Sequence, residues 1–172
     1  MIINPQVAID EGWITFPEEP INDQQLQPNG IDLRLKIAWK VPIHTPFKLY
    51  KDRTCHLNRY RAEGSLHKDI PVIIMERMMC YNVESFEFVS IPENVAAYVI
   101  GRSSLNRNGV FCRSTLYDSG FKDYVGAAVY PFVPCHLHYG ARFAQIIFME
   151  AQSAKMYDGQ YQLHESNRRH SD

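Results

Sequence analysis

The sequence has few of the features that define several large classes of protein. It contains four cysteines in 172 residues, and they are widely spaced, without a CxxC pair. That spacing argues against a disulfide framework and favours reduced thiols in a cytoplasmic protein. The sequence also lacks convincing helical periodicity over most of its length, which disfavours an α-helical bundle.

An excess of one charge is also missing, since 18 lysines and arginines face 19 aspartates and glutamates and give a net charge of −1. A nucleic-acid-binding protein would normally present a strongly basic face, so we expect no nucleic-acid partner. No apolar run is long enough to span a membrane, and the opening MIINPQVAIDEGW has neither the basic nor the apolar region of a signal peptide. These absences leave a small anionic molecule as a possible ligand, because a few local cations are enough to bind one.

Short segments with strand character, separated by Pro, Gly, Asn and Asp, are abundant. GIDLRLKIAW at 30–39 alternates, which predicts a half-buried strand with Ile31, Leu33, Leu35 and Ile37 on its inner face. Further strands are predicted at residues 69–75, 84–92, 96–101, 125–133 and 142–151.

Many short strands at close intervals predict an all-β fold, either a barrel or a double-sheet sandwich, with one or two short helices. The helices are expected in the first dozen residues and at SSLNRN. We expect one domain over residues 1–172, a solvated surface excursion at 44–70, and a flexible C-terminal arm at 153–172.

A basic, hydroxyl-rich turn follows the strand at 96–101. Arg102, Ser103 and Ser104 stand where that strand gives way to a short helix, which either serine could cap. Free backbone N–H groups, two hydroxyls and a guanidinium make a good phosphate site, although a capped helix with a surface arginine fits the motif equally well.

The stretch LYDSGF places one carboxylate in a tight turn beside an aromatic ring. Asp118 in Asp-Ser-Gly is ordinary turn chemistry, but its flanks are apolar, and a carboxylate at the mouth of a barrel could act as a general base. Phe121 could pack in the core or stack against a sugar or base.

Three other groups of polar residues are weaker candidates. Asp32 is either a salt-bridge partner of Arg34 or an acid that orders the site. If Gln145 shares a face with Phe143, its amide is buried and needs hydrogen-bond partners, which makes Gln145 a site candidate. CHLH at 135–138 places two histidines on one strand face without a clear third ligand, so an exposed strand face is favoured over a metal site.

Taken in order, these segments resemble the superfamily of dUTP diphosphatases (dUTPases) and dCTP deaminases. The resemblance rests on four motifs, QPNGIDLRL, GRSSLNRNG, YDSGFKD and GARFAQIIF, and on YDGQYQ as a C-terminal arm of the deaminase-like branch. It covers most of the chain and favours that branch over the compact dUTPases.

The resemblance implies a distorted β-barrel that assembles as a homotrimer with sites between subunits. One subunit would offer Arg102 and a set of further phosphate ligands, namely Ser103, Ser104 and Gln145. Another would offer the hairpin leading to Asp118, with Phe121 beneath the deoxyribose. The arm around Tyr161 and Gln162 would close over the nucleotide, with Lys155 as a phosphate contact.

The family also sets an expectation for the chemistry. Its deaminases carry a glutamate ten residues after the aspartate of the third motif, and here that position is Ala128. An alanine cannot transfer protons, so the expected reaction is dUTP hydrolysis to dUMP and diphosphate. Asp118 would activate water for attack at the α-phosphorus, with Mg²⁺ held mainly by the triphosphate and Asp32 in support.

Two departures from the family pattern leave other activities open. Asp123 and Tyr124 replace the usual small continuation of the third motif, and Cys112 and Arg113 lie where the hairpin should read the pyrimidine. Hydrolysis or deamination of dCTP or of a modified pyrimidine nucleotide therefore remains an alternative, as does a trimer that binds a nucleotide without turnover.

Overall fold

The fold is a closed barrel of six antiparallel strands, seen in a computed structural model that describes residues 1–51, 54–55 and 57–159. The barrel strands follow the order β9, β12, β11, β10, β14, β3, and β3 pairs back with β9 to close the ring. Their bounds are β3 (Gly30–Lys40), β9 (Tyr81–Ser90), β10 (Val95–Gly101), β11 (Val110–Tyr117), β12 (Lys122–Pro131) and β14 (Arg142–Glu150). The prediction of an all-β barrel is confirmed.

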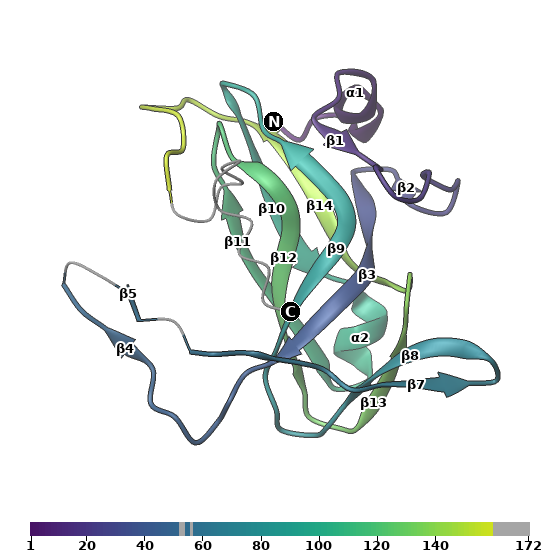
Figure 1. Cartoon of the computed structure of the whole chain (residues 1–172). Coiled ribbons are helices and arrows are strands. Elements are labelled where there is room, and N and C mark those ends of the chain that lie inside the picture. The colour runs from purple at the N-terminus through teal and green to yellow at the C-terminus, as the bar shows by residue number, and fades with distance from the viewer. Residues whose placement is uncertain (52–53, 56, 160–172) are drawn as a thin grey trace.

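Smaller elements decorate the two ends of the barrel (Figure 1). At one end lie α1 (Pro5–Asp10), β1 (Ile14–Thr15) and β2 (Leu26–Gln27). Near the other end lie α2 (Ser103–Arg107) and a small sheet of β7 (Gly64–His67), β8 (Ile70–Met75) and β13 (Cys135–His138). Both short helices were predicted. No helix in the described part of the chain is long and apolar enough to cross a membrane.

The predicted excursion at 44–70 is only partly a loop. Its first half carries the short hairpin of β4 (Lys48–Leu49) and β5 (Thr54–Cys55), which projects from the body in Figure 1. Its second half joins the sheets, because β6 (Tyr60–Arg61) pairs with β3 and β7 pairs with β8. The prediction of a solvated loop is therefore wrong for residues 60–67, where backbone pairing is made despite exposed side chains.

The alternation predicted along β3 breaks at a register shift between Leu35 and Ile37. Ile31, Leu33 and Leu35 lie in the core as expected, but beyond the shift Ala38 is buried and Ile37 is only half-buried. One irregular residue in a ladder moves the side chains that follow to the other face.

The polar face of β3 is also buried, contrary to the prediction of a half-buried strand. Arg34 does not pair with Asp32; its Nε donates to Glu87 Oε1 at 2.8 Å and its backbone N–H donates to Glu87 Oε2 at 2.9 Å. Gln25 Nε2 donates to the same carboxylate at 2.9 Å, and Arg34 also bonds to Glu19. This network fastens the segment that precedes β3 to the barrel wall.

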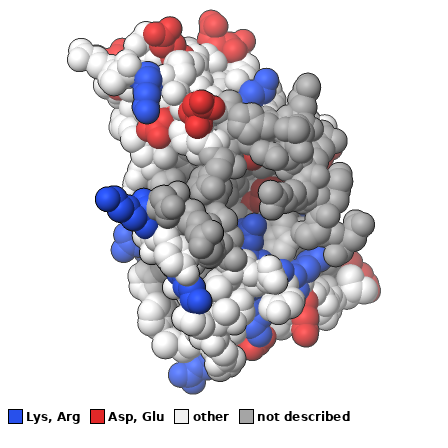
Figure 2. Space-filling model, turned by 60° about the vertical axis from the view of Figure 1, so that its left-hand side comes forward, with Lys and Arg blue, Asp and Glu red and all other residues white. Residues whose placement is uncertain are grey.

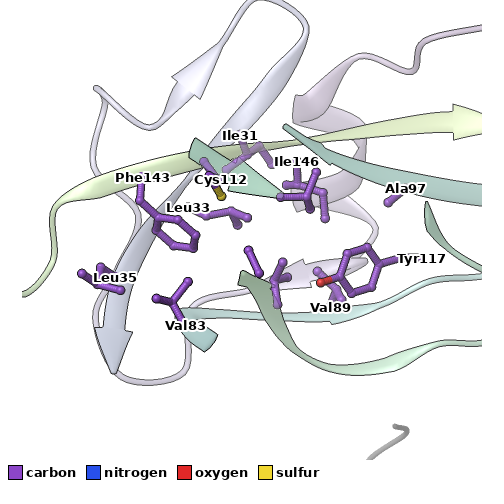
Figure 3. Packing of buried hydrophobic residues seen from close by; sticks show 14 of the residues in the cluster. Ile31, Leu33, Leu35, Val83, Val89, Ala97, Cys112, Tyr117, Phe143 and Ile146 are labelled. Atoms are coloured by element: carbon purple, nitrogen blue, oxygen red, sulfur yellow. The ribbon is translucent and has the colours of Figure 1, made fainter. Parts of the chain in front are cut away.

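Inward-facing side chains of all six strands fill the barrel (Figure 3). Leu33, Val83, Phe143 and Ile146 converge in its middle, and the ring of Tyr117 enters from the β11 side. No residue of this buried cluster is charged. On the face in Figure 2, acidic side chains are most frequent at the upper end, beside some basic ones, and basic side chains lie across the middle and lower part together with some acidic ones.

Candidate functional site

One group of polar residues gathers where β3, β14 and the start of α2 meet. Asp32 is 2% exposed; its Oδ2 accepts a hydrogen bond from Arg142 Nη1 at 3.2 Å and forms an ion pair with Arg102 Nε at 3.2 Å. Arg102 Nη1 also donates to the backbone oxygen of Arg142 at 3.2 Å. Asp32 therefore holds two guanidinium groups side by side, and the trio keeps a net charge of +1.

The electrostatics of Asp32 reflect its position between burial and positive charge. Burial raises the pKa of this carboxyl above its ordinary value, while Arg102, Arg142 and the Gln145 amide act to lower it. Gln145 Nε2 donates to Asp32 Oδ1 at 3.3 Å, so both carboxylate oxygens are bonded. Asp32 thus positions the arginines and the glutamine.

The sequence left open that Gln145 shares a face with Phe143, but in the structure it does not. A register shift between Arg142 and Ala144 leaves Phe143 and Ala144 both buried and turns Gln145 to the half-exposed outer face. Gly30 lies against it: a Cβ there would stand 2.6 Å from the Ile146 oxygen and 2.8 Å from Gln145 Cγ. Only glycine allows β3 to approach this close.

The serines of the second motif are placed differently from the prediction. Arg102 itself is the N-cap residue of α2, and its side chain makes no capping bond. Ser103 and Ser104 lie exposed in the first turn, so capping by either serine is wrong. Both serines belong to a helix start whose first N–H groups have no intrahelical partner.

The second group of residues surrounds the turn between β11 and β12. Phe121 N–H donates to the Asp118 carbonyl at 3.0 Å, and Gly120 closes the turn with φ +88°, a conformation that favours glycine. Asp118 itself is exposed. The turn therefore presents its carboxylate to solvent, as a general base requires.

Asp118 lines an open cavity of about 830 Å³ whose wall also includes the chain after β14. The cavity is lined by Ala96, Leu116, Asp118, Ser119 and residues 151–159, including Lys155. Tyr157 N–H donates to the Ser119 carbonyl at 2.7 Å, and Ser119 Oγ, hydrogen-bonded to Ser153 Oγ, donates to the Val95 carbonyl at 2.6 Å. These bonds bring the predicted Lys155 to the same cavity as Asp118.

Phe121 lies beneath this segment, packed between two tyrosines. It is 8% exposed, with ring centroids 4.9 Å from Tyr117 and 5.6 Å from Tyr157. The ring thus packs in the core in this structure, and its contact with a sugar stays a prediction that would need Tyr157 to move.

The hairpin leading into Asp118 opens before it reaches the turn. The β11–β12 ladder ends at the pair Arg113 and Ala128, and beyond it the Tyr117 hydroxyl donates to the Gly126 carbonyl at 2.6 Å and accepts from the Gly126 N–H at 3.0 Å. Arg113 is exposed, opposite Ala128. Cys112 points into the core, and burial raises its pKa to about 12, so it cannot read a base edge.

The two groups lie at opposite ends of one strand, as α2 and the chain after β14 do in Figure 1. Ala97 pairs with Tyr117, next to Asp118, whereas Arg102 comes five residues after Ala97. At about 3.4 Å per residue, Ala97 and Arg102 lie about 17 Å apart along the strand. Within one chain, Asp32, Arg102 and Gln145 form one group and Asp118 and Lys155 form another, and the two groups do not meet. Tyr161 and Gln162 lie outside the described residues.

Two contributors were not identified from the sequence. Arg142 gave a signal, because it is a cation at the first residue of the predicted strand 142–151, which pairs with β3 beside Asp32. Tyr157 gave none, because its contact with Phe121 depends on the path of an irregular segment.

The chain belongs to the dCTP deaminase-like family, whose pattern it matches over residues 6–151. It is 32% identical over 149 residues to a deoxyuridine 5'-triphosphate nucleotidohydrolase of Methanocaldococcus jannaschii, covering 82% of this chain and 89% of that protein. It is 29% identical over 175 residues to a dUMP-forming dCTP deaminase of Sulfurihydrogenibium, covering 94% and 92%. Its relatives thus carry the names of two different enzymes.

A solved structure of 2'-deoxycytidine 5'-triphosphate deaminase from Agrobacterium tumefaciens shares the fold. The TM-score is 0.65 at 19% identity, over 86% of this chain and 47% of that one, so the chain spans about half the length of that neighbour.

Proposed function

We propose that this protein is a dUTP diphosphatase, which hydrolyses dUTP to dUMP and diphosphate in a homotrimer. The observation that carries the proposal is the exposed Asp118, held in a tight turn at the edge of a cavity that also contains Lys155. The relatives named as nucleotidohydrolases support the substrate class.

In the proposed mechanism Asp118 accepts a proton from a water that attacks the α-phosphorus in line with the departing diphosphate. Arg102, and the helix start with Ser103 and Ser104, donate hydrogen bonds to phosphate oxygens as charge develops there. Asp32 keeps Arg102 in place, and Gln145 lies beside it as a further phosphate ligand.

Magnesium fits this arrangement as an ion carried by the substrate. Both oxygens of Asp32 are already bonded, and Asp118 offers a single exposed carboxylate. Mg²⁺ commonly binds through phosphates and retained waters, and when bound it would neutralise triphosphate charge. Lys155 would add a positive charge on the Asp118 side of the site.

The separation of about 17 Å between Asp118 and Arg102 supports a site shared between copies. In that arrangement the Asp118 cavity of one copy receives the base and sugar, and the Arg102 group of a neighbour receives the phosphates. The arm around Tyr161 and Gln162 would complete the closure.

The charge on Asp118 gives a direct test. Asp118→Asn keeps the size and turn-forming ability of the side chain but removes the base, so kcat should fall at least about 10²-fold while KM changes little. Diphosphate release from dUTP is the measurement, and Asp69→Asn, at an exposed acid between β7 and β8 and outside the Asp118 cavity, is the control. Unchanged turnover in Asp118→Asn would exclude this residue as the base.

Hydrolysis of dCTP is the second candidate, favoured by the exposed Arg113 in the hairpin that would hold the pyrimidine. A panel of deoxynucleoside triphosphates, scored for diphosphate and for ammonia, separates the candidates. Diphosphate release from dCTP and not from dUTP would make dCTP hydrolysis the leading candidate. Ammonia from dCTP would show deamination despite Ala128, and tight binding without either product would indicate a binding protein.

A further inference from the structure

Two histidine rings meet on the small sheet of β7, β8 and β13, outside both groups of the candidate site. The rings of His67 in β7 and His138 in β13 have centroids 5.8 Å apart and planes at 79° to each other. His67 is exposed and His138 is half-buried. The sequence offered His138 only its neighbour His136 as a possible co-ligand, and the folded sheet adds a second imidazole from a distant segment.

The register of the sheet explains why these two side chains meet. Ile70 of β8 lies opposite His67 of β7. Two residues further along β8, Val72 lies opposite His138 of β13. Residues directly opposite point to the same face, as do residues two apart on one strand, so the two histidines share a face and flank β8. The turn at 68–69 fixes this register, because both of its residues have positive φ, as a two-residue hairpin turn requires.

The imidazole nitrogens of this pair have no other partner within the described part of the chain. Neither ring makes a hydrogen bond or an ion pair there, and the two rings are not hydrogen-bonded to each other. A neutral imidazole nitrogen is the commonest metal ligand in proteins and suits zinc, copper and nickel. The pair therefore presents two such ligands from two different strands.

The spacing of the rings fits a shared metal ion. At a metal–nitrogen distance of about 2.1 Å, each ring centroid lies about 3.2 Å from the ion. Two rings on one ion then have centroids about 5.2 Å apart at the tetrahedral angle, and at most about 6.4 Å apart. The observed 5.8 Å lies between these limits. Each ring can rotate about its metal–nitrogen bond, so the angle of 79° between the planes is also compatible.

We propose that His67 and His138 bind one divalent transition-metal ion, with zinc or copper as the class of ion. No cluster of three or more His, Cys, Asp or Glu side chains suited to a metal exists among the described residues, so this ion takes two protein ligands and completes its shell with water. It joins β7 to β13 across β8 and so fastens the two outer strands of this sheet. Mg²⁺ of the proposed reaction is a different ion, because it prefers oxygen ligands.

Calorimetric titration of the full chain with ZnCl₂, after purification without a histidine tag, tests the site. The wild type should bind one ion per chain at this pair. His67→Ala and His138→Ala should each weaken that binding at least about tenfold, since even an outer partner of a metal ligand contributes that much to affinity. CuCl₂ should bind to the same pair more tightly than ZnCl₂.

His136→Ala is the matched control, because it removes an exposed histidine from the same strand and the same face. His136 lies opposite Ile74, which is four residues, or about 13 Å, along β8 from Ile70 and so too far from His67 to share its ion. This variant should bind zinc as the wild type does.

A wild type without zinc binding, one ion shared by two chains, or unchanged binding in His67→Ala or His138→Ala would each overturn the proposal. An equal loss in His136→Ala would overturn it too, because the pair would not be the site. Circular dichroism shows whether each variant is folded, and exposed His67 decides the question if His138→Ala does not fold. The titration needs no nucleotide, so its result is independent of the proposed function.

Discussion

Glu87 is the most deeply buried charged residue among those that the structure describes. It is fully buried and accepts hydrogen bonds from the Arg34 side chain, the Arg34 backbone and Gln25. A buried charge that loses its partner costs far more than an exposed one, because the remaining charge stays away from water. The network therefore makes the position of β3, and with it that of Asp32, depend on one carboxylate.

Glu87→Gln should lower the free energy of unfolding by about 3–5 kcal/mol, since it leaves Arg34 without a buried counter-ion. Urea unfolding followed by circular dichroism measures the change. Glu150→Gln removes an exposed carboxylate from its ion pair with the N-terminus and should cost less than about 1 kcal/mol. Equal losses in the two variants would show that the buried network adds no stability.

The sequence revealed single residues better than it revealed their partners. Asp32 was identified as a candidate, but Arg34, its neighbour on the strand, was considered as its partner instead of Arg102 and Arg142. The actual partners come from two distant segments that meet only in the folded barrel. Asp118 was easier, because its turn is local and is encoded by the adjacent Ser119 and Gly120.

At the level of secondary-structure elements, the segment after β14 folds onto the Asp118 turn of its own chain. Tyr157 covers Phe121, and Ser153 bonds to Ser119. An aromatic pair adds about 0.5–1.5 kcal/mol beyond the area that it buries. Residues 151–159 are therefore held by a few specific contacts, and weakening one of them should release the segment.

Tyr157→Ala should speed tryptic cleavage after Lys155 about two- to tenfold, because the protease acts on the released segment. Mass spectrometry of a short digestion time course gives the rate. Asp158→Ala alters an exposed neighbour in the same segment and should leave cleavage unchanged. Cleavage at the wild-type rate in Tyr157→Ala would mean that the Phe121 contact does not hold the segment.

The strands could be predicted from the sequence, but their faces could not always be. Residues 142–151 were recognised as a strand, yet the irregularity at Phe143 and Ala144 put Gln145 on the opposite face from the one considered. The same happened at Ile37 in β3. A register shift depends on how the partner strand fits, and no periodicity within one strand records it.

At the scale of the whole molecule, the barrel separates the proposed base from the proposed phosphate ligands. Mixing two inactive variants tests whether a site forms between chains. Asp118→Asn and Arg102→Ala should each be inactive, but when they are unfolded together and refolded, mixed assemblies contain some sites with both groups intact. Diphosphate release from dUTP should then recover to a substantial fraction of the wild-type rate.

Refolding each variant alone is the control for this experiment and should restore nothing. Failure of the mixture to recover, while refolded wild type recovers fully, would place Asp118 and Arg102 of the same chain in one site. That result would require a rearrangement of β10 and β11, since about 17 Å separates the two residues here.

If the site is shared between copies, as proposed, the distance along β10 also makes protein concentration a variable of the chemistry. When a site needs two chains, each chain is inert while alone, so the fraction of working sites follows the law of mass action. Serial dilution at saturating nucleotide would then lower the rate per chain, and adding more protein would restore it. A cell that halves its supply of this protein near that threshold would lose more than half of its activity.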